Sequence, residues 1–309
     1  YMIQPKTGYI RINRFGATTA EEFKKAMKDL QKKGMKDMIL DLQGNGGGYL
    51  NAAIDLANEF LGQKELIVYT EGRTAKRSDF YAKGNGDFRN GRLIILVDEY
   101  TASASEIVSG AVQGWDRGII VGRRSFGKGL VQRPIDLPDG SMIRLTIARY
   151  YTPSGRSIQK PYGSTVDYNK DLIDRFNHGE LMNADSIHFP DSLKVQTKKL
   201  GRTVYGGGGI MPDYFVPIDT TLYTDYHRNL VGKGVIIKFT MQFIEEHRKE
   251  LANKYKKFES FNEKFVIDDN MLATLREMGE KEGVKFNEEQ YQKALPLIKT
   301  QLKALIARD

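Results

Sequence analysis

The sequence predicts an α/β fold, and three observations support that prediction. Within residues 1–150, short apolar runs alternate with stretches of helical periodicity, a pattern typical of stacked βα units. With 309 residues, 40% of them apolar, the chain has the length of about two domains and can bury a large core. From about residue 220 onward the pattern is helical. We therefore expect an α/β core with a β-hairpin extension over residues 1–217, and a C-terminal helical region over residues 218–309.

The elements of the core follow from periodicity and from the residues that bound helices. Strands are expected where short apolar or β-branched runs lie between turn signals, at residues 9–12, 38–42, 66–69, 93–97 and 118–122. Helices are expected where apolar residues recur at helical spacing, at residues 18–34, 50–61 and 103–115. A glycine-rich loop at residues 44–48 joins the second strand to the second helix.

The pattern changes after residue 122. Two strand-like runs, residues 130–137 and 141–151, are separated by the turn Pro138-Asp139-Gly140 and predict the hairpin. Residues 152–201 are polar and irregular, so we expect an insertion or a lid-like loop. Residues 202–213, which include four consecutive glycines, are expected to return to the sheet. The remaining helices are expected at residues 234–257, 268–281 and 287–307, the last one kinked or broken at Pro296.

Composition excludes several classes of function. The chain has no cysteine, which excludes disulfides, thiolate nucleophiles, zinc fingers and iron–sulfur clusters. The longest apolar run, residues 93–97, is far shorter than the roughly 20 residues of a membrane span, and no signal-like segment opens the chain. The net charge is +8, but charges of both signs interleave over residues 245–259, as on a solvated helix face. We therefore expect neither a membrane span nor a nucleic-acid partner.

Histidine and metal chemistry have little support in the sequence. The histidines His178, His188, His227 and His247 all lie in the second half of the chain, and none adjoins a serine at a strand–helix junction. A Ser–His–Asp triad is therefore disfavoured, although triads can assemble from distant residues. We expect surface positions for His178, His227 and His247. No spacing matches that of metal ligands, so no metal and no other cofactor are expected.

Ser103 lies in a turn of small residues between a buried strand and a helix. Free N–H groups and the helix dipole favour negative charge at a helix start, so a hydroxyl there can lose its proton and an oxyanion can be held. The simpler interpretation is that Ser103 caps the helix while Glu106 completes a capping box. Both interpretations stay open on these residues alone.

Lys128 is flanked by Gly127 and Gly129 at the start of an apolar strand. Glycine permits close approach, so the amine is expected against a buried helix start, out of water, where its neutral form can take a serine proton. Gln132 faces the same side of the strand and can orient the amine. The alternative is a surface lysine in a loop. A P-loop is excluded because Gly129 stands where that motif needs a hydroxyl residue.

Taken together, these motifs resemble the carboxyl-terminal processing, or tail-specific, serine peptidases. The separation of 25 residues between Ser103 and Lys128, and of 4 between Lys128 and Gln132, match the Ser–Lys–Gln arrangement of that family. Residues 41–48 resemble its Asp-Leu-Arg-x-Asn-x-Gly-Gly stretch, and residues 206–213 resemble its late glycine-rich strand. The resemblance covers about residues 9–217.

The resemblance implies a ClpP/crotonase-like core, with Ser103 as nucleophile, Lys128 as general base and Gln132 as the residue that positions the lysine. It also implies an oxyanion hole made by the N–H of Ala104 and by one glycine of residues 46–48, for which Gly47 is our choice. The implied activity is that of a serine endopeptidase that cleaves proteins near their C-termini. Its partner would be a protein or peptide substrate with an exposed C-terminus.

The sequence departs from the family pattern at several points. Gly114 stands where relatives often carry aspartate, with Asp116 two residues later, and Gln43 replaces the usual arginine beside the glycine loop. Relatives usually present a PDZ domain before the strand that begins near Tyr9, and eight residues precede it here, so we expect that portion to be lacking. By the same resemblance we expect a periplasmic or cell-envelope location. The C-terminal helices are a candidate surface for homo-oligomers.

Two other functions are compatible with the motifs. A crotonase-like acyl-CoA enzyme would use N–H groups of the glycine loop as its oxyanion hole, but it has no need for Lys128 and Gln132 on one face. A noncatalytic peptide-binding scaffold would keep the same fold without the chemistry.

Overall fold

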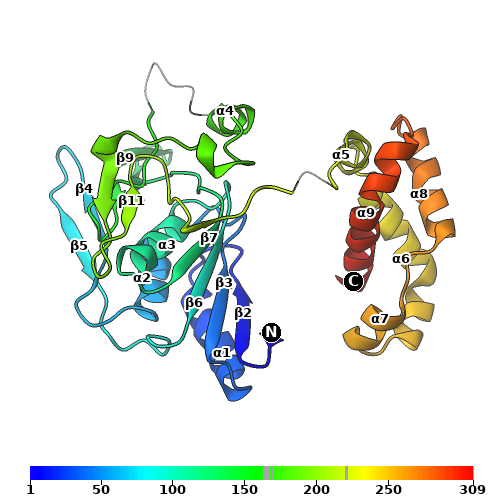
Figure 1. Cartoon of the computed structure of the whole chain (residues 1–309), viewed down its shortest axis with the longest axis horizontal. Coiled ribbons are helices and arrows are strands. Elements are labelled where there is room, and N and C mark those ends of the chain that lie inside the picture. The colour runs from blue at the N-terminus through cyan, green and yellow to red at the C-terminus, as the bar shows by residue number, and fades with distance from the viewer. Residues whose placement is uncertain (163–167, 169, 220–221, 309) are drawn as a thin grey trace. The chain divides into compact units, whose positions relative to one another are not determined.

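A computed structural model describes residues 1–162, 168, 170–219 and 222–308 of the chain (Figure 1). Internal contacts divide the protein into two units, Tyr1–Ile218 and Asp219–Asp309. Each unit has a hydrophobic core of its own. The two units are therefore described separately.

A mostly parallel sheet forms the centre of the first unit. Its strands in spatial order are β1 (Met2–Gln4), β2 (Thr7–Arg11), β3 (Asp37–Asp41), β6 (Leu93–Val97), β7 (Ile119–Gly122) and β12 (Tyr214–Phe215). Only β1 pairs antiparallel, with β2. The apolar runs of β3 and β6 suit strands that are covered on both faces. These strands confirm the α/β class that the sequence predicts.

Three helices pack against this sheet in the order that the sequence predicts. They are α1 (Thr19–Lys32), α2 (Leu50–Asn58) and α3 (Ala104–Gly114). In α1 the buried side chains of Phe23, Met27 and Leu30 recur at helical spacing and join the core. α2 packs on α3, which contacts both β7 and β4, so these two helices lie between the large sheet and a smaller one (Figure 1).

The smaller sheet is antiparallel and contains the predicted hairpin. Its strands in spatial order are β5 (Ser78–Tyr81), β4 (Leu66–Glu71), β9 (Met142–Tyr151) and β8 (Leu130–Asp136). The hairpin strands β8 and β9 are joined through residues 137–141, and their register shifts between Val131 and Gln132. The first strand of this hairpin, β8, begins two residues after Lys128, so the hairpin continues directly from the segment that carries the lysine.

The segment expected to be an irregular insertion carries regular structure. Within residues 152–201 the chain forms α4 (Asp171–Asn177), short 3-10 turns at Ala184–Ser186 and Asp191–Leu193, and β10 (Lys194–Gln196), which pairs with β11 (Thr203–Tyr205). Residues 163–167 and 169 of this segment lie outside the described residues. A buried polar anchor explains the order: Arg175 on α4 donates to the carbonyls of Arg124 and Ser125 at 2.6 and 3.2 Å. Buried hydrogen bonds of this kind therefore account for part of the polarity of the segment, whose other polar residues are mostly exposed.

Residues 202–213 are expected to return to the sheet, but the strand that joins it begins at Tyr214. The strand that joins the large sheet is β12, which lies parallel to β7, whereas β11 pairs only with β10 among the described strands. The glycines at 206–209 instead lie against residues of the lysine-bearing loop and the 156–158 segment.

The second unit is helical, as the sequence predicts. Its helices are α5 (Asp225–Gly232), α6 (Val235–Lys254), α7 (Phe258–Lys264), α8 (Asp269–Lys281) and α9 (Glu288–Arg308). The helices α5 and α7 are not predicted from the sequence. The expected break at Pro296 does not occur, because α9 continues through it while Ala294, Ile298 and Leu302 stay on the buried face. Tertiary packing outweighs the local cost of a helical proline. None of the described helices has the length and apolarity needed to cross a membrane.

One histidine differs from its expected surface position. His227 on α5 is only 4% exposed, and its Nε2 lies 2.9 Å from Oε1 of Gln301 on α9. The expectation was wrong because the apolar neighbours Tyr226 and Leu230 turn this face of α5 into the core. His227 is therefore a packing residue of the second unit.

Candidate active site

The carboxyl ends of neighbouring parallel strands lead into the segments that form one cleft. Residues 13–15 follow β2, the glycine loop 44–48 follows β3, the turn before α3 follows β6, and residues 123–129 follow β7. Because the carboxyl ends of parallel strands meet at one edge of a sheet, these segments lie together. The cleft has a volume of about 780 Å³, and its lining includes Arg14, Tyr49, Ser103, Lys128, Gln132 and Arg144.

Ser103 adopts an unusual backbone conformation at the start of α3. Its φ is +56° and its ψ is −112°, a region that non-glycine residues rarely adopt and that costs about 1–3 kcal/mol. Ser103 is half-buried, and its backbone N–H donates a hydrogen bond to Glu106 Oε2 at 2.8 Å. Glu106 thus caps the helix start, as the simpler interpretation predicts. The same contact fixes the turn from which the hydroxyl of Ser103 reaches the cleft.

The carboxylate of Glu106 joins the serine turn to the lysine loop. Besides Ser103, it accepts hydrogen bonds from the N–H groups of Gly127 at 2.7 Å and Lys128 at 2.9 Å, and from Ser125 Oγ at 2.5 Å. Burial raises the pKa of Glu106, and these four bonds oppose that rise. The fully buried side chain of Glu106 therefore sets the distance between the backbone of the serine turn and the backbone of the lysine loop. Sequence reasoning noticed Glu106 only as a cap, because its contacts 19–22 residues away leave no local signal.

The backbone of the lysine loop is bonded at every residue from 125 to 129. The N–H groups of Ser125, Phe126, Gly127, Lys128 and Gly129 donate in turn to Ile210 O, Thr101 O, Glu106 Oε1, Glu106 Oε2 and Gln159 Oε1. A Cβ on Gly129 would lie 2.6 Å from Gln159 N. The flanking glycines therefore do permit close approach, as predicted, but what approaches is the loop backbone.

The side chain of Lys128 is exposed. Among the described residues it makes no hydrogen bond or ion pair, so its amine is not joined to Ser103. The expectation that this amine lies against a buried helix start, out of water, is wrong. The reason lies in strand geometry: positions 128, 130, 132 and 134 alternate onto the cleft face, which is open. Gln132 lines the same cleft as predicted and is also exposed.

The glycine loop is tied to the serine turn by Asn45, which is fully buried. The carbonyl of Asn45 accepts from Ala102 N at 2.9 Å, and its Oδ1 accepts from Gly47 N at 2.9 Å. A Cβ on Gly47 would lie 2.7 Å from Ser103 Cβ, so only glycine fits there. The loop and the serine turn are thus in direct contact.

Several N–H groups beside Ser103 can face a developing oxyanion. The buried Ala104 N–H has no acceptor in the part of the chain that the structure describes. The N–H of Gly47 is engaged by Asn45, whereas those of Gly46 and Gly48, which also line the cleft, meet no acceptor among the described residues. Gly47 can therefore serve as a donor only after it releases Asn45.

The departures from the family pattern have structural explanations. Asp116 is buried and pairs with Arg202 at 2.7 Å, while the N–H groups of residues 199 and 200 donate to it, so it anchors that loop. Arg11 on β2 lies 3.6 Å from Asp41 and donates to the carbonyl of Gln43 at 3.3 Å. This cation lies beside Gln43, the position at which the family pattern that the sequence resembles has arginine. In the described ranges, no three His, Asp or Glu side chains gather as metal ligands would.

Both units of the chain match families of known proteins. Residues 6–169 match Peptidase family S41, and residues 226–309 match a family of unknown function (DUF8443). The chain is 43% identical over 155 residues to a carboxyl-terminal-processing protease of Picosynechococcus, a match that covers 50% of this chain and 37% of that protein. It is 44% identical over 167 residues to a carboxy-terminal-processing protease of Bartonella bacilliformis, covering 52% and 38%. The match thus spans little more than a third of these relatives.

A longer match and a solved structure extend the comparison. A “Probable CtpA-like serine protease” of Staphylococcus aureus is 29% identical over 282 residues, covering 89% of this chain and 55% of that protein. The structure of the photosystem II D1 C-terminal processing protease matches with a TM-score of 0.51 and 28% identity, covering 72% of this chain and 45% of that one.

Proposed function

The chain belongs to peptidase family S41, and on that premise we propose that it is a serine endopeptidase that cleaves protein substrates near their C-termini. Two relatives of this chain are named as carboxyl-terminal-processing proteases, which supports this reaction. The observation that carries the proposal is the cleft itself: Ser103, Lys128 and Gln132 line it together, and one buried carboxylate holds the backbones of the first two.

The reaction would proceed through an acyl-enzyme. Lys128 Nζ accepts the proton of Ser103 Oγ while that oxygen attacks a peptide carbonyl. The resulting oxyanion is stabilised by the N–H of Ala104 together with one N–H of residues 46–48. As the peptide bond breaks, the leaving amine takes the proton from Lys128. A water activated by the same lysine then hydrolyses the ester on Ser103.

Substrate supplies what the open cleft lacks. A peptide lying over the cleft excludes water from around Lys128, and removal of water favours the neutral amine that can act as a base. Gln132 lies two cleft-facing positions after Lys128, on β8, so its amide oxygen can accept a hydrogen bond from the amine and orient it. Apo enzymes commonly hold such catalytic pairs apart until substrate binds.

A noncatalytic peptide-binding scaffold is the competing function, and the exposure of Lys128 favours it. Such a scaffold would bind peptides in the cleft without cleaving them. The acyl-CoA enzyme has no comparable observation in its favour.

The test is cleavage of an unfolded protein with an apolar C-terminus by the full chain, with new termini identified by mass spectrometry. Wild type should cleave, and the separate variants Ser103→Ala and Lys128→Ala should not. Cleavage that survives both substitutions would overturn the proposal. Binding without cleavage by wild type would support the scaffold, and hydrolysis of a CoA ester would support the third function.

From the resemblance we further propose that the reaction takes place in the periplasm or cell envelope. Self-association through the C-terminal helices also stays a proposal, which sedimentation velocity of the full chain tests directly.

A further inference from the structure

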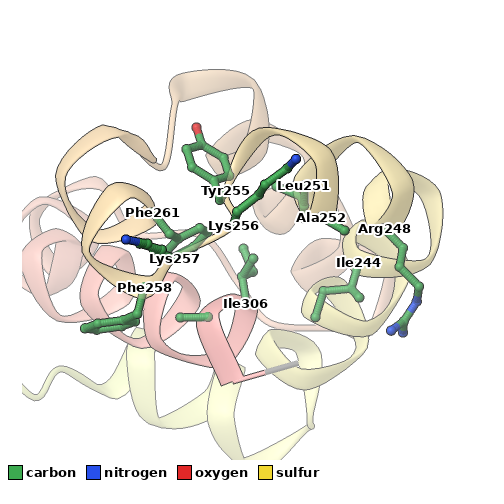
Figure 2. Close-up of a pocket in the computed structure, with 11 residues that line it drawn as sticks. Ile244, Arg248, Leu251, Ala252, Tyr255, Lys256, Lys257, Phe258, Phe261 and Ile306 are labelled. Atoms are coloured by element: carbon green, nitrogen blue, oxygen red, sulfur yellow. The ribbon is translucent and has the colours of Figure 1, made fainter.

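The second unit contains an apolar groove of about 340 Å³ bounded by α6, residues 255–257, α7 and α9 (Figure 2). Its floor is formed by Ile244, Phe261 and Ile306, which are only 8%, 7% and 5% exposed. Phe258 at the edge is 64% exposed, although its ring is large and apolar. The groove therefore offers a hydrophobic surface to which apolar groups can bind.

Among the described residues, the charged side chains that line the groove are all basic. Arg248, Lys256 and Lys257 line it, and no Asp or Glu is among the lining residues. Figure 2 shows Arg248 on one side and Lys257 with Phe258 on the other. Within the described residues neither Lys256 nor Lys257 has a carboxylate partner. Both lysine side chains are therefore available to an anionic group at the rim without the loss of an existing ion pair.

This charge is local and not a property of the whole unit. Residues 219–309 contain 16 Lys and Arg against 15 Asp and Glu, which is nearly balanced. The stretch 248–257, which borders the groove, contains five Lys and Arg against the single acidic residue Glu250. Basic residues are therefore denser beside the groove than in the unit as a whole, where they complement an anion beside an apolar group.

We propose that this groove binds the free C-terminal residue of an unfolded polypeptide, with an apolar side chain on the floor and the α-carboxylate at Lys256 and Lys257. The proposal rests on the proposed function, because an enzyme that cleaves near C-termini gains selectivity by recognising the terminus. An internal segment would fill the floor but leave the cations unpaired. The volume lies near the lower end of ligand pockets, about 300–1,000 Å³, which suits a chain end of one or two residues.

The test uses the full chain with Ser103→Ala, so that the probe is not consumed. Fluorescence anisotropy compares a labelled peptide ending in two apolar residues as its free carboxylate and as its carboxamide. The carboxylate should bind about tenfold more tightly, the magnitude expected of two partly exposed charge contacts. Adding Lys256→Gln with Lys257→Gln should abolish that difference.

Two further variants isolate the groove. Lys281→Gln with Lys285→Gln makes the same change of net charge at exposed sites outside the groove, and it should leave the preference for the carboxylate intact. Ala252→Trp places a bulky side chain at an exposed lining position, and it should weaken binding of both peptides. Together the variants separate a site from a general charge effect.

Each other outcome overturns the inference. Equal affinity for carboxylate and carboxamide would do so, and so would a preference that survives the Lys256/Lys257 change, which would assign it to the cleft of the first unit. Binding to phosphatidylglycerol vesicles without binding to the peptide would show a lipid surface instead. Failure of the proposed function is a separate result: wild type that never cleaves but binds the carboxylate through Lys256 and Lys257 contradicts the peptidase and supports the groove.

Discussion

The lysine loop and the cleft face of the hairpin differ in how firmly the protein holds them. From residue 125 to residue 129 every backbone N–H donates to a partner in the first unit. The side chains of Lys128 and Gln132, which leave this loop and the strand after it, are exposed in the open cleft. The fold therefore fixes where the base is attached. Whether the amine of Lys128 is shielded from water depends on what occupies the cleft.

The largest effect should come from the groups that do the chemistry. Replacing Ser103 or Lys128 with alanine should lower kcat/KM at least about 10³-fold, because nucleophile and base act as a unit. Tm should hardly change for Lys128→Ala, since the side chain is exposed. Lys128→Arg is the matched control: it keeps the charge but cannot release its proton, so it should be as inactive as alanine. An active arginine variant would contradict the role of the amine as a base.

Changing Glu106 should loosen the backbone of the lysine loop, which the fold holds firmly. In Glu106→Gln one carboxylate oxygen is replaced by an NH2 group, which cannot accept hydrogen bonds from the two donors that this oxygen serves. The loss should lower the free energy of unfolding by about 1–3 kcal/mol and shift the lysine loop. We expect kcat to fall about 10–100-fold, with a smaller change in KM. Glu59→Gln is the control, because Glu59 is equally buried but pairs with Lys24 away from the cleft. It should lose stability and keep kcat; equal kcat in both variants would refute the positioning role.

Changing Gln132 tests the exposed side chains on the cleft face of the hairpin. Gln132→Ala should lower kcat about tenfold and leave Tm unchanged, because the side chain is exposed and orients only the amine. Arg133→Ala is the control, since residue 133 is equally exposed but does not line the cleft. If both substitutions act alike, the alternation along β8 does not matter for catalysis.

The smallest effect concerns pH and stability. Because burial raises the pKa of Glu106, the folded protein keeps that proton to higher pH than the unfolded chain does. Between the two pKa values the folded state binds more protons, so the free energy of unfolding falls as the pH rises. Tm should therefore decline with pH above about 4.3, more steeply in wild type than in Glu106→Gln. Parallel Tm curves would show that the carboxyl does not titrate in this way.

The sequence predicted most of what local pattern controls. The strands β2, β3, β6 and β7 of the large sheet, the hairpin and the turn that bears Ser103 follow from periodicity and turn residues, whereas β1 and β12 were not predicted. The family resemblance, which rests on motif spacing, likewise implied the grouping of Ser103, Lys128 and Gln132 found in the cleft. The strands and turns depend on neighbours in the chain, so single-sequence reasoning can reach them.

What the sequence did not predict depends on distant contacts. Glu106 has a complete local explanation as a cap, and its bonds to the lysine loop exist only in the folded protein. The exposure of Lys128 depends on how the hairpin faces the cleft, which no spacing encodes. Pro296 stays inside α9 because the helix packs on its neighbours. In each case tertiary structure outweighs the local signal.

One measurement tests the proposed chemistry most directly. A cleavage reaction is quenched in acid within its first turnover, and the digested protein is searched by mass spectrometry for a substrate acyl group. We expect the adduct on Ser103 in wild type, and no adduct in Lys128→Ala. An adduct at another residue, or one that forms on Ser103 equally fast without the lysine, would contradict the account.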